Sequence, residues 1–354
     1  FHEPKNSQAV ANCRDRQKKE HGMSVEVMTH PNDSLAALLA PKLAAVNSLI
    51  SERMASEHAP RIPELTAHLV AAGGKRLRPM LTLASAMMCG YKGPFDIHLA
   101  ATVEFIHTAT LLHDDVVDES TQRRGRPTAN LLWDNKSSIL VGDYLFSRAF
   151  QLMVETGSLQ VLDILSNASA TIAAGEVLQL TAARDLSTSE EIYMQVVRGK
   201  TAALFSASTE VGGIIAGAPQ THCKALYDYG DALGIAFQIV DDLLDVTGDS
   251  SVTGKNVGDD FRERKLTLPF IKAISKANTE ELEFWSRTIA KGAQKDGDIE
   301  RALDLLSLHG AIDETRQDAL HWAKRAQDAI LLLPEHDIRD ILHSLAIYVV
   351  DRIN

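Results

Sequence analysis

Apolar residues recur at intervals of three and four along most of the chain after Ser34. The segments "SLAALLAPKLAAVNSLI" and "VLDILSNASATIAAGEVLQL" show this spacing, with Ala and Leu filling most apolar positions. Such spacing places apolar side chains along one face of an α-helix. Alternating β-branched residues, which are typical of strands, are scarce, and aromatic residues make up only 5% of the chain. The pattern therefore predicts an all-α fold.

Short stretches rich in Gly, Pro and polar residues separate these predicted helices, for example at 90–94, 123–127 and 216–220. None is long enough or simple enough in composition to be a linker between domains. We therefore expect one helical domain over residues 31–354. Residues 1–30 lack this periodicity and are interpreted as a poorly ordered N-terminal extension.

Composition narrows the class of protein. The formal net charge is −11, which disfavours a broad nucleic-acid interface. Cys13, Cys89 and Cys223 are isolated and odd in number, so we expect neither a disulfide framework nor a zinc site. No uninterrupted apolar run approaches the ~18 residues of a membrane span. The chain is predicted to be a soluble cytoplasmic protein without a transmembrane segment.

A spacing of Asp-Asp-x-x-Asp occurs twice, each time after an apolar helical segment and before a turn. The two copies consist of Asp114, Asp115, Asp118, Asp241, Asp242 and Asp245. On a helix, residues four apart share one face, so Asp114 and Asp118 repel each other unless a cation lies between them. Oxygen-only ligands suit Mg²⁺, which usually also binds substrate phosphates. A single copy is equally typical of a solvated acidic helix end, but the repeat favours a metal site that holds a diphosphate.

Basic residues lie close to both acidic motifs. Lys75 and Arg78 follow a pair of glycines at the entry to a predicted helix, where backbone N–H groups and guanidinium groups can bind phosphate. The further bases near the motifs are Arg123, Arg124, Lys200, Lys255 and Lys265. Any one of them alone is typical of a surface salt bridge. Their clustering around the acidic motifs favours a site for anionic substrates.

The ordered series "GGKRLRP", "LLHDDVVDESTQRRGRPTAN", "GKTAALF", "FQIVDDLLD" and "GKNVGDDFRERKLTLP", over residues 73 to 269, resembles the motif series of the trans-isoprenyl diphosphate synthases. This resemblance implies a large helical bundle around a central cavity, working as a homodimer. It further implies Mg²⁺, about three ions per site with diphosphate bound, held by the aspartates of both motifs.

The resemblance also implies two diphosphate sites. The allylic diphosphate would be held by metal together with Arg123 and Lys265 and with the catalytic residues Lys200, Thr201, Gln238 and Lys255. Isopentenyl diphosphate would be held by Lys75, Arg78, His107 and Arg124. A single histidine on an apolar helix is also typical of an ordinary core residue, so both interpretations of His107 stay open.

Product length is predicted from the residues one helical turn, ~5.4 Å, before the first acidic motif. These are Ala109 and Thr110, whereas relatives making short products commonly carry an aromatic residue at this level. Two small side chains imply an open passage and a product of about eight to ten isoprene units, since a helix of ~20 residues offers a cavity on the order of 30 Å deep. Such products usually become quinone side chains. Candidates for the floor of the passage are Phe146, Phe150 and Met153, each of which is equally typical of an ordinary core residue.

Other functions remain open from the sequence. They are a synthase of shorter products such as farnesyl or geranylgeranyl diphosphate, a class I terpene cyclase, a non-catalytic subunit of a heteromeric synthase, and a bundle that merely binds Mg²⁺ and anions. A cyclase normally has an Asn/Ser/Glu pattern at its second metal site, and regulatory subunits tend to lose the acidic motifs. Here both motifs are present, which favours the synthase.

Overall fold

The computed structural model describes residues 30–56, 58–71, 74, 76–123, 125–248 and 257–352. Contacts group Pro31–Asn354 into one compact unit, which is the part considered below. In chain order its elements are α2 (Pro31–Met54), α3 (Arg61–Ala71), α4 (Leu77–Met88), α5 (Phe95–Val117), β1 (Gln122–Arg123), β2 (Arg126–Pro127), α6 (Ala129–Leu132), α7 (Asn135–Glu155), α8 (Leu159–Ala182), α9 (Glu190–Val197), the π-helical turn η1 (Arg198–Ala202), α10 (Ala203–Ile215), α11 (Gln220–Thr247), α13 (Asp259–Arg262), α14 (Leu268–Ser275), α15 (Thr279–Trp285), the π-helical turn η2 (Ser286–Ala290), α16 (Asp298–Leu308), α17 (Ala311–Ile330) and α18 (Asp337–Asp351).

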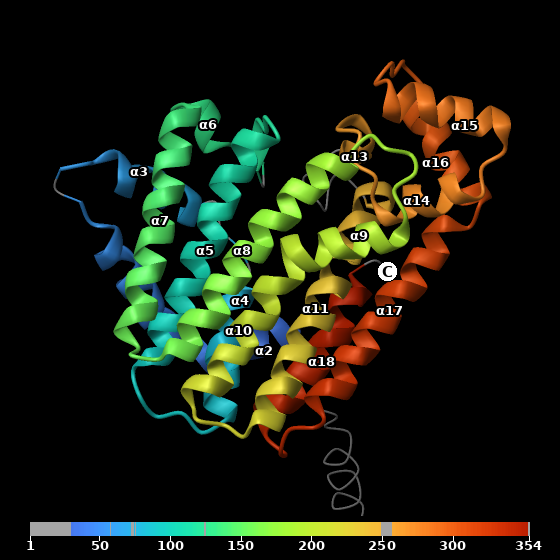
Figure 1. Cartoon of the computed structure of the whole chain (residues 1–354). Coiled ribbons are helices and arrows are strands. Elements are labelled where there is room, and N and C mark those ends of the chain that lie inside the picture. Colours follow the sequence, from blue (N-terminus) through green and yellow to red (C-terminus); the bar gives the residue numbers. More distant parts are fainter. Residues whose placement is uncertain are drawn as a thin grey trace, which may run out of the picture. The chain divides into compact units, whose positions relative to one another are not determined.

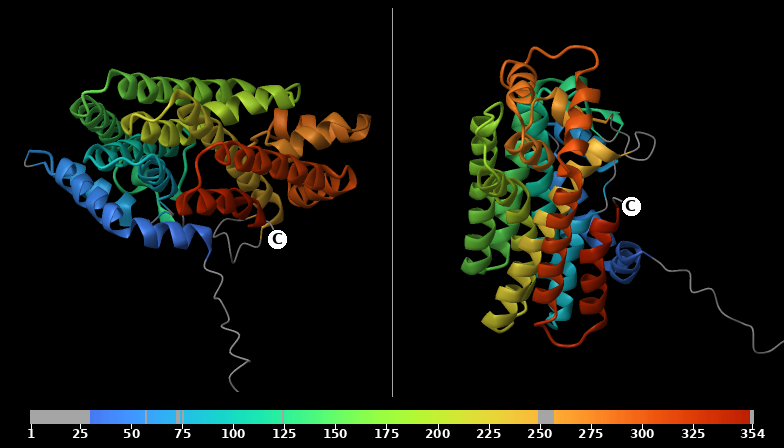
Figure 2. Two further views of the ribbon diagram at one scale, coloured as in Figure 1. Left: turned by 90° about the horizontal axis from the view of Figure 1, so that it is seen from below. Right: turned by 90° about the vertical axis from the view of Figure 1, so that its right-hand side faces the viewer.

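The all-α fold predicted from the spacing of apolar residues is confirmed. Long helices run up and down beside one another, and the short helices α13 to α16 gather at one end (Figure 1). Helix α5 packs against α7 and α4, and α11 packs between α10 and α17. Helix α18 packs against α17 and α2, as both views in Figure 2 show. Helices α5 and α11, which carry the acidic motifs, thus belong to the interior of the bundle.

Two apolar cores hold the unit together. The larger core fills the bundle and includes Leu99, Phe105 and Leu233, which are fully or almost fully buried. The smaller core lies under the short helices and is built around Phe261, Phe270 and Trp285. Their aromatic rings meet at centroid distances of 6.0 to 6.4 Å. The smaller core supports residues 257–267, which precede α14 and include Lys265.

The strands β1 and β2 pair in antiparallel fashion where the sequence suggested a simple loop. Arg123 of β1 pairs with Arg126 of β2. Gly125 adopts φ of 72°, the left-handed conformation that a two-residue hairpin turn requires and that glycine adopts without strain. The hairpin turns the chain back toward the end of α5.

Helices α2 and α8 are long and apolar enough to span a membrane when judged only by length and composition. Polar residues interrupt both sequences, so a search for unbroken apolar runs does not detect them. Length and composition alone are weak indications, because helices of soluble proteins pass the same test. Only 28% of the apolar window in α8 is buried within the structure. Most of this apolar window is therefore left uncovered within one copy of the chain.

Candidate active site

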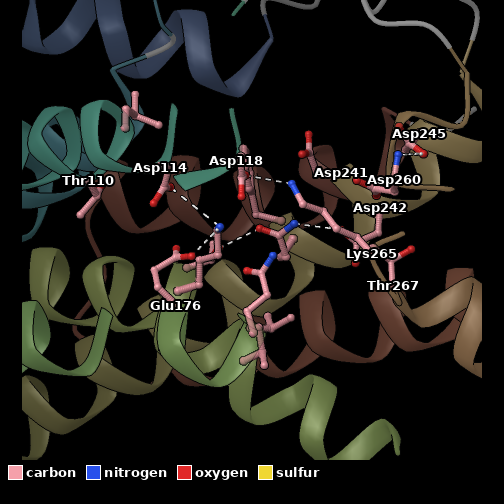
Figure 3. Close-up of a pocket in the computed structure, with 18 of the residues that line it drawn as sticks. Thr110, Asp114, Asp118, Glu176, Asp241, Asp242, Asp245, Asp260, Lys265 and Thr267 are labelled. Atoms are coloured by element: carbon pink, nitrogen blue, oxygen red, sulfur yellow. Dashed lines mark hydrogen bonds and ion pairs between the residues drawn. The ribbon is translucent and has the colours of Figure 1, made fainter. Parts of the chain in front are cut away.

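A cavity of about 940 Å³ lies between the helices that carry the two acidic motifs. Figure 3 shows aspartates from α5 on one side of it and aspartates from α11 on the other. The cavity brings together most of the residues selected from the sequence, namely Arg78, His107, Thr110, Asp114, Asp118, Arg123, Lys200, Thr201, Gln238, Asp241, Asp242, Asp245 and Lys265. Residues from both motifs and most of the selected bases therefore share one site.

On the α5 side, Asp114 and Asp118 face the cavity one helical turn apart. Lys200 reaches across from η1, and its Nζ lies 2.9 Å from Oε2 of Glu176 and 3.8 Å from Oδ2 of Asp114. Burial raises the pKa of Asp114 to about 6, and although Lys200 lowers it, the carboxylates of Glu176 and Asp118 raise it further. The ionised form of Asp114 is therefore disfavoured unless another cation approaches.

Asp115 does not line the cavity. Its side chain is buried, and Oδ1 accepts hydrogen bonds from Nε and Nη2 of Arg123 at 3.0 and 2.8 Å. Within the described part of the chain, Oδ2 of Asp115 has no hydrogen-bond partner. The adjacent position is rotated by about 100° around the helix, which turns Asp115 away from the stripe that holds Asp114. Asp115 thus holds Arg123 at the cavity wall.

On the α11 side, Asp242 is buried and engaged at both of its oxygens. Oδ1 accepts a hydrogen bond from Nε2 of Gln238 at 2.8 Å, and Oδ2 accepts one from the hydroxyl of Tyr193 at 2.5 Å. The hydroxyl of Thr201 donates to Oε1 of the same Gln238 at 2.7 Å. Burial raises the pKa of Asp242 to about 7, although the hydrogen bonds from Tyr193 and Gln238 lower it. Asp241 lies beside it and also lines the cavity.

The last aspartate of the second motif anchors the segment that begins at residue 257. The backbone N–H of Asp260 donates to Oδ2 of Asp245 at 3.2 Å. The backbone N–H of Gly258 donates to the backbone carbonyl of Asp245 at 2.8 Å. This segment leads to Lys265, whose Nζ lies 2.9 Å from Oδ2 of Asp118 on α5. Lys265 therefore spans the cavity from the second motif to the first, as Figure 3 shows.

A close helix crossing places Lys200. The α-carbon of Gly175 on α8 lies only 2.8 Å from where a Cβ on Gly199 would stand, so neither backbone tolerates a side chain at this point. The residues that follow the two glycines, Glu176 and Lys200, are the ion pair described above. Lys200 belongs to a π-helical turn, a local widening of the helix that is frequent at functional sites.

Arg78 and His107 lie together at another part of the cavity. Nη1 of Arg78 is 3.4 Å from Nε2 of His107, and the guanidinium stacks 4.4 Å from the ring centroid of Phe205. The side chain of Arg78 is thus held by an aromatic face and a histidine while it borders the cavity. The sequence left open whether His107 is a core residue; it lines the cavity.

The structure separates the two residues expected to set product length. Thr110 lines the cavity, one turn before Asp114. Ala109 is fully buried, on the same stripe of α5 as Phe105 and Leu112, and does not line the cavity. The structure thus brings only Thr110 of the two to the cavity, because adjacent helix positions face different directions.

The floor candidates do not line this cavity either. Met153 is buried in the core, and the exposed fraction of Phe150 is 42%. Phe146 is partly buried, with its ring 6.0 Å from the ring of His113. All three belong to α7, which lies on the other side of α5. Three other predicted residues, Lys75, Arg124 and Lys255, lie outside the described residues.

Sequence reasoning missed several residues of the site. Glu176 is one of two acids in the apolar helix α8, the other being Asp163, and a rare acid in such a helix is a signal that could have identified it. Asp260 lies within a quoted motif but received no role. Tyr193, seven residues before Lys200, has no distinguishing sequence signal, since a tyrosine at a helical apolar position is typical of a core residue.

The donor set fits a divalent cation shared with a ligand. In the described residues, no three His, Cys, Asp or Glu side chains are grouped closely enough to hold a metal by themselves. The raised pKa of Asp114 nevertheless shows that its carboxylate lies in a setting where an added cation would stabilise the ionised form. The ammonium group of Lys200 lies near the carboxylate of Asp114, and that of Lys265 lies near the carboxylate of Asp118. These two lysines balance the charge of the two aspartates.

Comparisons with known proteins agree with this geometry. A family model described as polyprenyl synthetase matches residues 59–306. The octaprenyl diphosphate synthase of Escherichia coli is 43% identical over 320 residues, which are 90% of this chain and 98% of that protein. An all-trans-nonaprenyl-diphosphate synthase of Rhodobacter capsulatus is 41% identical over 90% of this chain and 97% of its own length.

Solved structures show the same relationship. The crystal structure of a decaprenyl diphosphate synthase from Rhodobacter capsulatus has 67% sequence identity and a TM-score of 0.89, and covers 91% of this chain and 99% of that one. A polyprenyl synthase from Caulobacter crescentus, solved with calcium and isoprenyl diphosphate, has 48% identity and a TM-score of 0.87 over 91% of this chain and 98% of that one. The chain therefore belongs to the polyprenyl synthetase family, as a trans-prenyltransferase of the long-chain polyprenyl diphosphate synthase group.

Proposed function

We propose that the chain condenses isopentenyl diphosphate repeatedly onto an allylic diphosphate, to a product of roughly eight to ten isoprene units. The single observation that carries this proposal is the cavity in which Asp114 and Asp118 face Asp241, with Lys200 and Lys265 between the two sides. The relatives named above make octaprenyl, nonaprenyl or decaprenyl diphosphates, which supports a product of this length.

We propose Mg²⁺ as the metal, held from α5 by Asp114 and Asp118 and from α11 by Asp241. Prenyl diphosphate synthases as a family are generally divalent-metal dependent. When bound, about three ions would neutralise the charge that develops on the departing diphosphate. Asp115 and Asp242, which the sequence suggested as ligands, have protein partners, so we assign them to positioning Arg123 and Gln238. Asp245 is assigned to anchoring the segment at Asp260.

The remaining site residues fit the two substrates. Lys200, Lys265 and Arg123 would bind the allylic diphosphate, and Arg78 with His107 would bind isopentenyl diphosphate. The allylic C–O bond then breaks, and its electron pair leaves with the diphosphate. The double bond of isopentenyl diphosphate attacks the resulting cation, and loss of a proton to the departing diphosphate restores an alkene. The apolar side chains Phe205 and Phe237 on the cavity wall would limit access of water to the cation.

We also propose a homodimer. The exposed faces of α6, α7 and α8 carry a set of large apolar side chains, namely Leu131, Leu132, Leu140, Phe150, Val154, Val177 and Leu180. The exposed fraction reaches 66% for Leu140 and 65% for Val177, which is costly in water unless a partner covers these faces. A second copy of the chain on these faces would explain why the apolar helix α8 is so poorly covered within one copy. A cytoplasmic location and a product destined for quinone side chains complete the proposal.

The test is incubation of the purified protein with farnesyl diphosphate, radiolabelled isopentenyl diphosphate and Mg²⁺, followed by removal of phosphate and sizing of the alcohols. A long-chain alcohol that disappears with a chelator is expected. A product of only one or two added units would indicate the shorter-chain synthase, and turnover of farnesyl diphosphate without isopentenyl diphosphate would indicate a cyclase. No incorporation with any allylic primer would support the non-catalytic subunit.

A further inference from the structure

Tyr193 is buried on α9 and borders the cavity, but neither the metal nor the diphosphates need it directly. Its hydroxyl lies 2.5 Å from Oδ2 of Asp242. Burial and the carboxylate of Asp242 raise the pKa of Tyr193 well above its ordinary value, so the phenol keeps its proton. The hydroxyl is therefore a fixed hydrogen-bond donor to a buried carboxylate.

The hydrogen bonds around Asp242 have a defined direction. Because Asp242 accepts at Oδ1, the amide group of Gln238 must point its NH₂ toward the carboxylate. Its Oε1 is then turned toward the hydroxyl of Thr201, which donates to it at 2.7 Å. A flipped amide would place a carbonyl oxygen against the carboxylate, so the carboxylate decides the orientation of Gln238 and, through it, that of Thr201.

The helix that carries Tyr193 is itself fixed. Ser189 caps its start by accepting a hydrogen bond from the N–H of Ile192. Nζ of the buried Lys272 lies 3.1 Å from Oε2 of Glu190 and 3.0 Å from Oδ2 of Asp318 on α17. Helix α9 then runs directly into η1, which carries Thr201. Tyr193 and Thr201 thus approach Asp242 and Gln238 from one continuous, anchored helical segment.

We infer that Tyr193 is a positioning residue, which holds the carboxylate of Asp242 so that Gln238 and Thr201 keep their polar atoms oriented in the cavity. The inference rests on the proposed function, since Gln238 and Thr201 line the cavity in which the allylic substrate would react. Without the hydroxyl, one oxygen of a buried carboxylate loses its donor. The carboxyl group can then rotate toward other donors and release the amide of Gln238.

The first test is Tyr193→Phe, which removes a single oxygen atom. We expect kcat to fall about 10- to 100-fold, the range for a lost hydrogen bond to a charged group, with KM for both substrates within about threefold of the parent value. The matched control is Tyr229→Phe. Tyr229 is also buried and its hydroxyl also makes one hydrogen bond, to the backbone carbonyl of Leu342 at 2.8 Å, outside the cavity.

The control separates positioning from stability. Both variants are expected to lower the thermal unfolding midpoint, but only Tyr193→Phe should lower kcat. A Tyr193→Phe enzyme with parental kcat and a reduced unfolding midpoint, like the control, would overturn the inference. A rise in KM with unchanged kcat would overturn it as well, because that pattern indicates lost substrate binding.

A double-mutant cycle tests the route of action. If Tyr193 acts through Gln238, Tyr193→Phe should change kcat by less than about threefold in a Gln238→Met background, because the group to be oriented is already absent. If the two effects on kcat multiply, Tyr193 acts independently of Gln238 and the inference fails.

A structural readout separates this inference from the proposed function. In a crystal structure of the Tyr193→Phe protein, the amide of Gln238 should have moved away from Oδ1 of Asp242. If the parent protein makes no prenyl product, the proposed function fails, but this structure still tests the positioning role. An amide that keeps both its bond to Asp242 and its bond from Thr201 in the variant would overturn the inference.

Discussion

Nζ of Lys265 lies 2.9 Å from Oδ2 of Asp118, and this ion pair joins the two sides of the cavity that carry the acidic motifs. Burial lowers the pKa of Lys265, but the carboxylates of Asp118 and Glu263 raise it by more, so the ammonium group stays charged. A divalent ion bound to Asp118 would compete for the same oxygen. A diphosphate would at the same time offer Lys265 a new partner. When metal and substrate enter together, Asp118 could therefore pair with the metal while Lys265 pairs with the diphosphate.

Replacing Lys265 by Ala should therefore weaken binding of the allylic diphosphate. We expect its KM to rise about 10- to 100-fold, since a charge-assisted hydrogen bond contributes roughly 1.5–3 kcal/mol. Steady-state kinetics at saturating isopentenyl diphosphate measure this. Arg262→Ala is the matched control, because Arg262 lies in the same segment but its side chain is exposed and does not line the cavity. Equal effects of the two substitutions would contradict the assignment of Lys265.

The two adjacent aspartates of the first motif should behave differently. Asp114→Asn should raise the Mg²⁺ concentration for half-maximal activity about tenfold or more, because it removes a proposed ligand. Asp115→Asn should act through Arg123, so its effect on kcat/KM should be largely absent in an Arg123→Gln background. Titrations of activity with Mg²⁺ decide this. If Asp115→Asn shifts the Mg²⁺ dependence as strongly as Asp114→Asn, Asp115 is a ligand after all.

Thr110→Phe should shorten the product. Thr110 borders the cavity one turn from Asp114, so an aromatic ring there should block elongation beyond a few isoprene units. The chain lengths of the dephosphorylated products measure this, and an unchanged distribution would refute the role of Thr110. Ala109→Phe should instead destabilise the fold by about 1–3 kcal/mol, because it overpacks a fully buried position. Denaturant unfolding of this variant provides the comparison.

Magnesium should stabilise the protein more at pH 8 than at pH 5.5. Burial raises the pKa of Asp114 to about 6 and that of Asp242 to about 7, above the ordinary value of 3.8. Their contribution to stability is present at low pH and is lost as the pH rises through these values. A divalent ion bound to Asp114 and to Asp241, which adjoins Asp242, would stabilise the ionised form of both carboxylates and should restore the lost stability only at the higher pH.

Scanning calorimetry with and without Mg²⁺ at pH 5.5, 7 and 8 measures this dependence. The increase in unfolding midpoint caused by Mg²⁺ should grow steadily over this range. An increase that is equal at all three pH values would show that these carboxylates are not linked to metal binding. Na⁺ at matched ionic strength serves as the control for non-specific screening.

Leu140→Glu should dissociate the proposed homodimer. Leu140 is 66% exposed on α7, at the apolar face described above, and a buried charge there would lack a partner. Sedimentation equilibrium should show a dimer for the parent and a monomer for the variant. Leu308→Glu is the control, because Leu308 is 69% exposed on α16, away from that face. If the parent protein sediments as a monomer, the homodimer proposal is wrong.

Much of the fold and of the site followed from local spacing. The three- and four-residue periodicity predicts helices because backbone geometry repeats every 3.6 residues. The repeated Asp-Asp-x-x-Asp spacing selected Asp114 and Asp118 as partners on one face, and both line the cavity. The same spacing could not show that Asp115 is turned away from the cavity, or that Asp242 is held by protein donors. That depends on the rotation of α5 and α11 about their axes, which packing against neighbouring helices sets.

Contacts distant in sequence lay beyond such reasoning. Arg123 donates hydrogen bonds to Asp115 because a small hairpin turns the chain back onto α5. Tyr193 is 49 residues from Asp242, and Lys265 is 147 residues from Asp118. Nothing in the local pattern distinguishes Tyr193 from a core tyrosine, so its role could come only from the folded chain.

The sequence by itself thus determined the helical class, the acidic and basic character of the site and most of its members, because those properties belong to residue type and short-range spacing. The tertiary structure alone decided which carboxylates are presented to the cavity and which are held by protein donors. It also decided that Ala109 lies in the core while Thr110 borders the cavity. The physical reason is that the direction and burial of a side chain depend on how whole helices pack, and packing is a property of the entire chain.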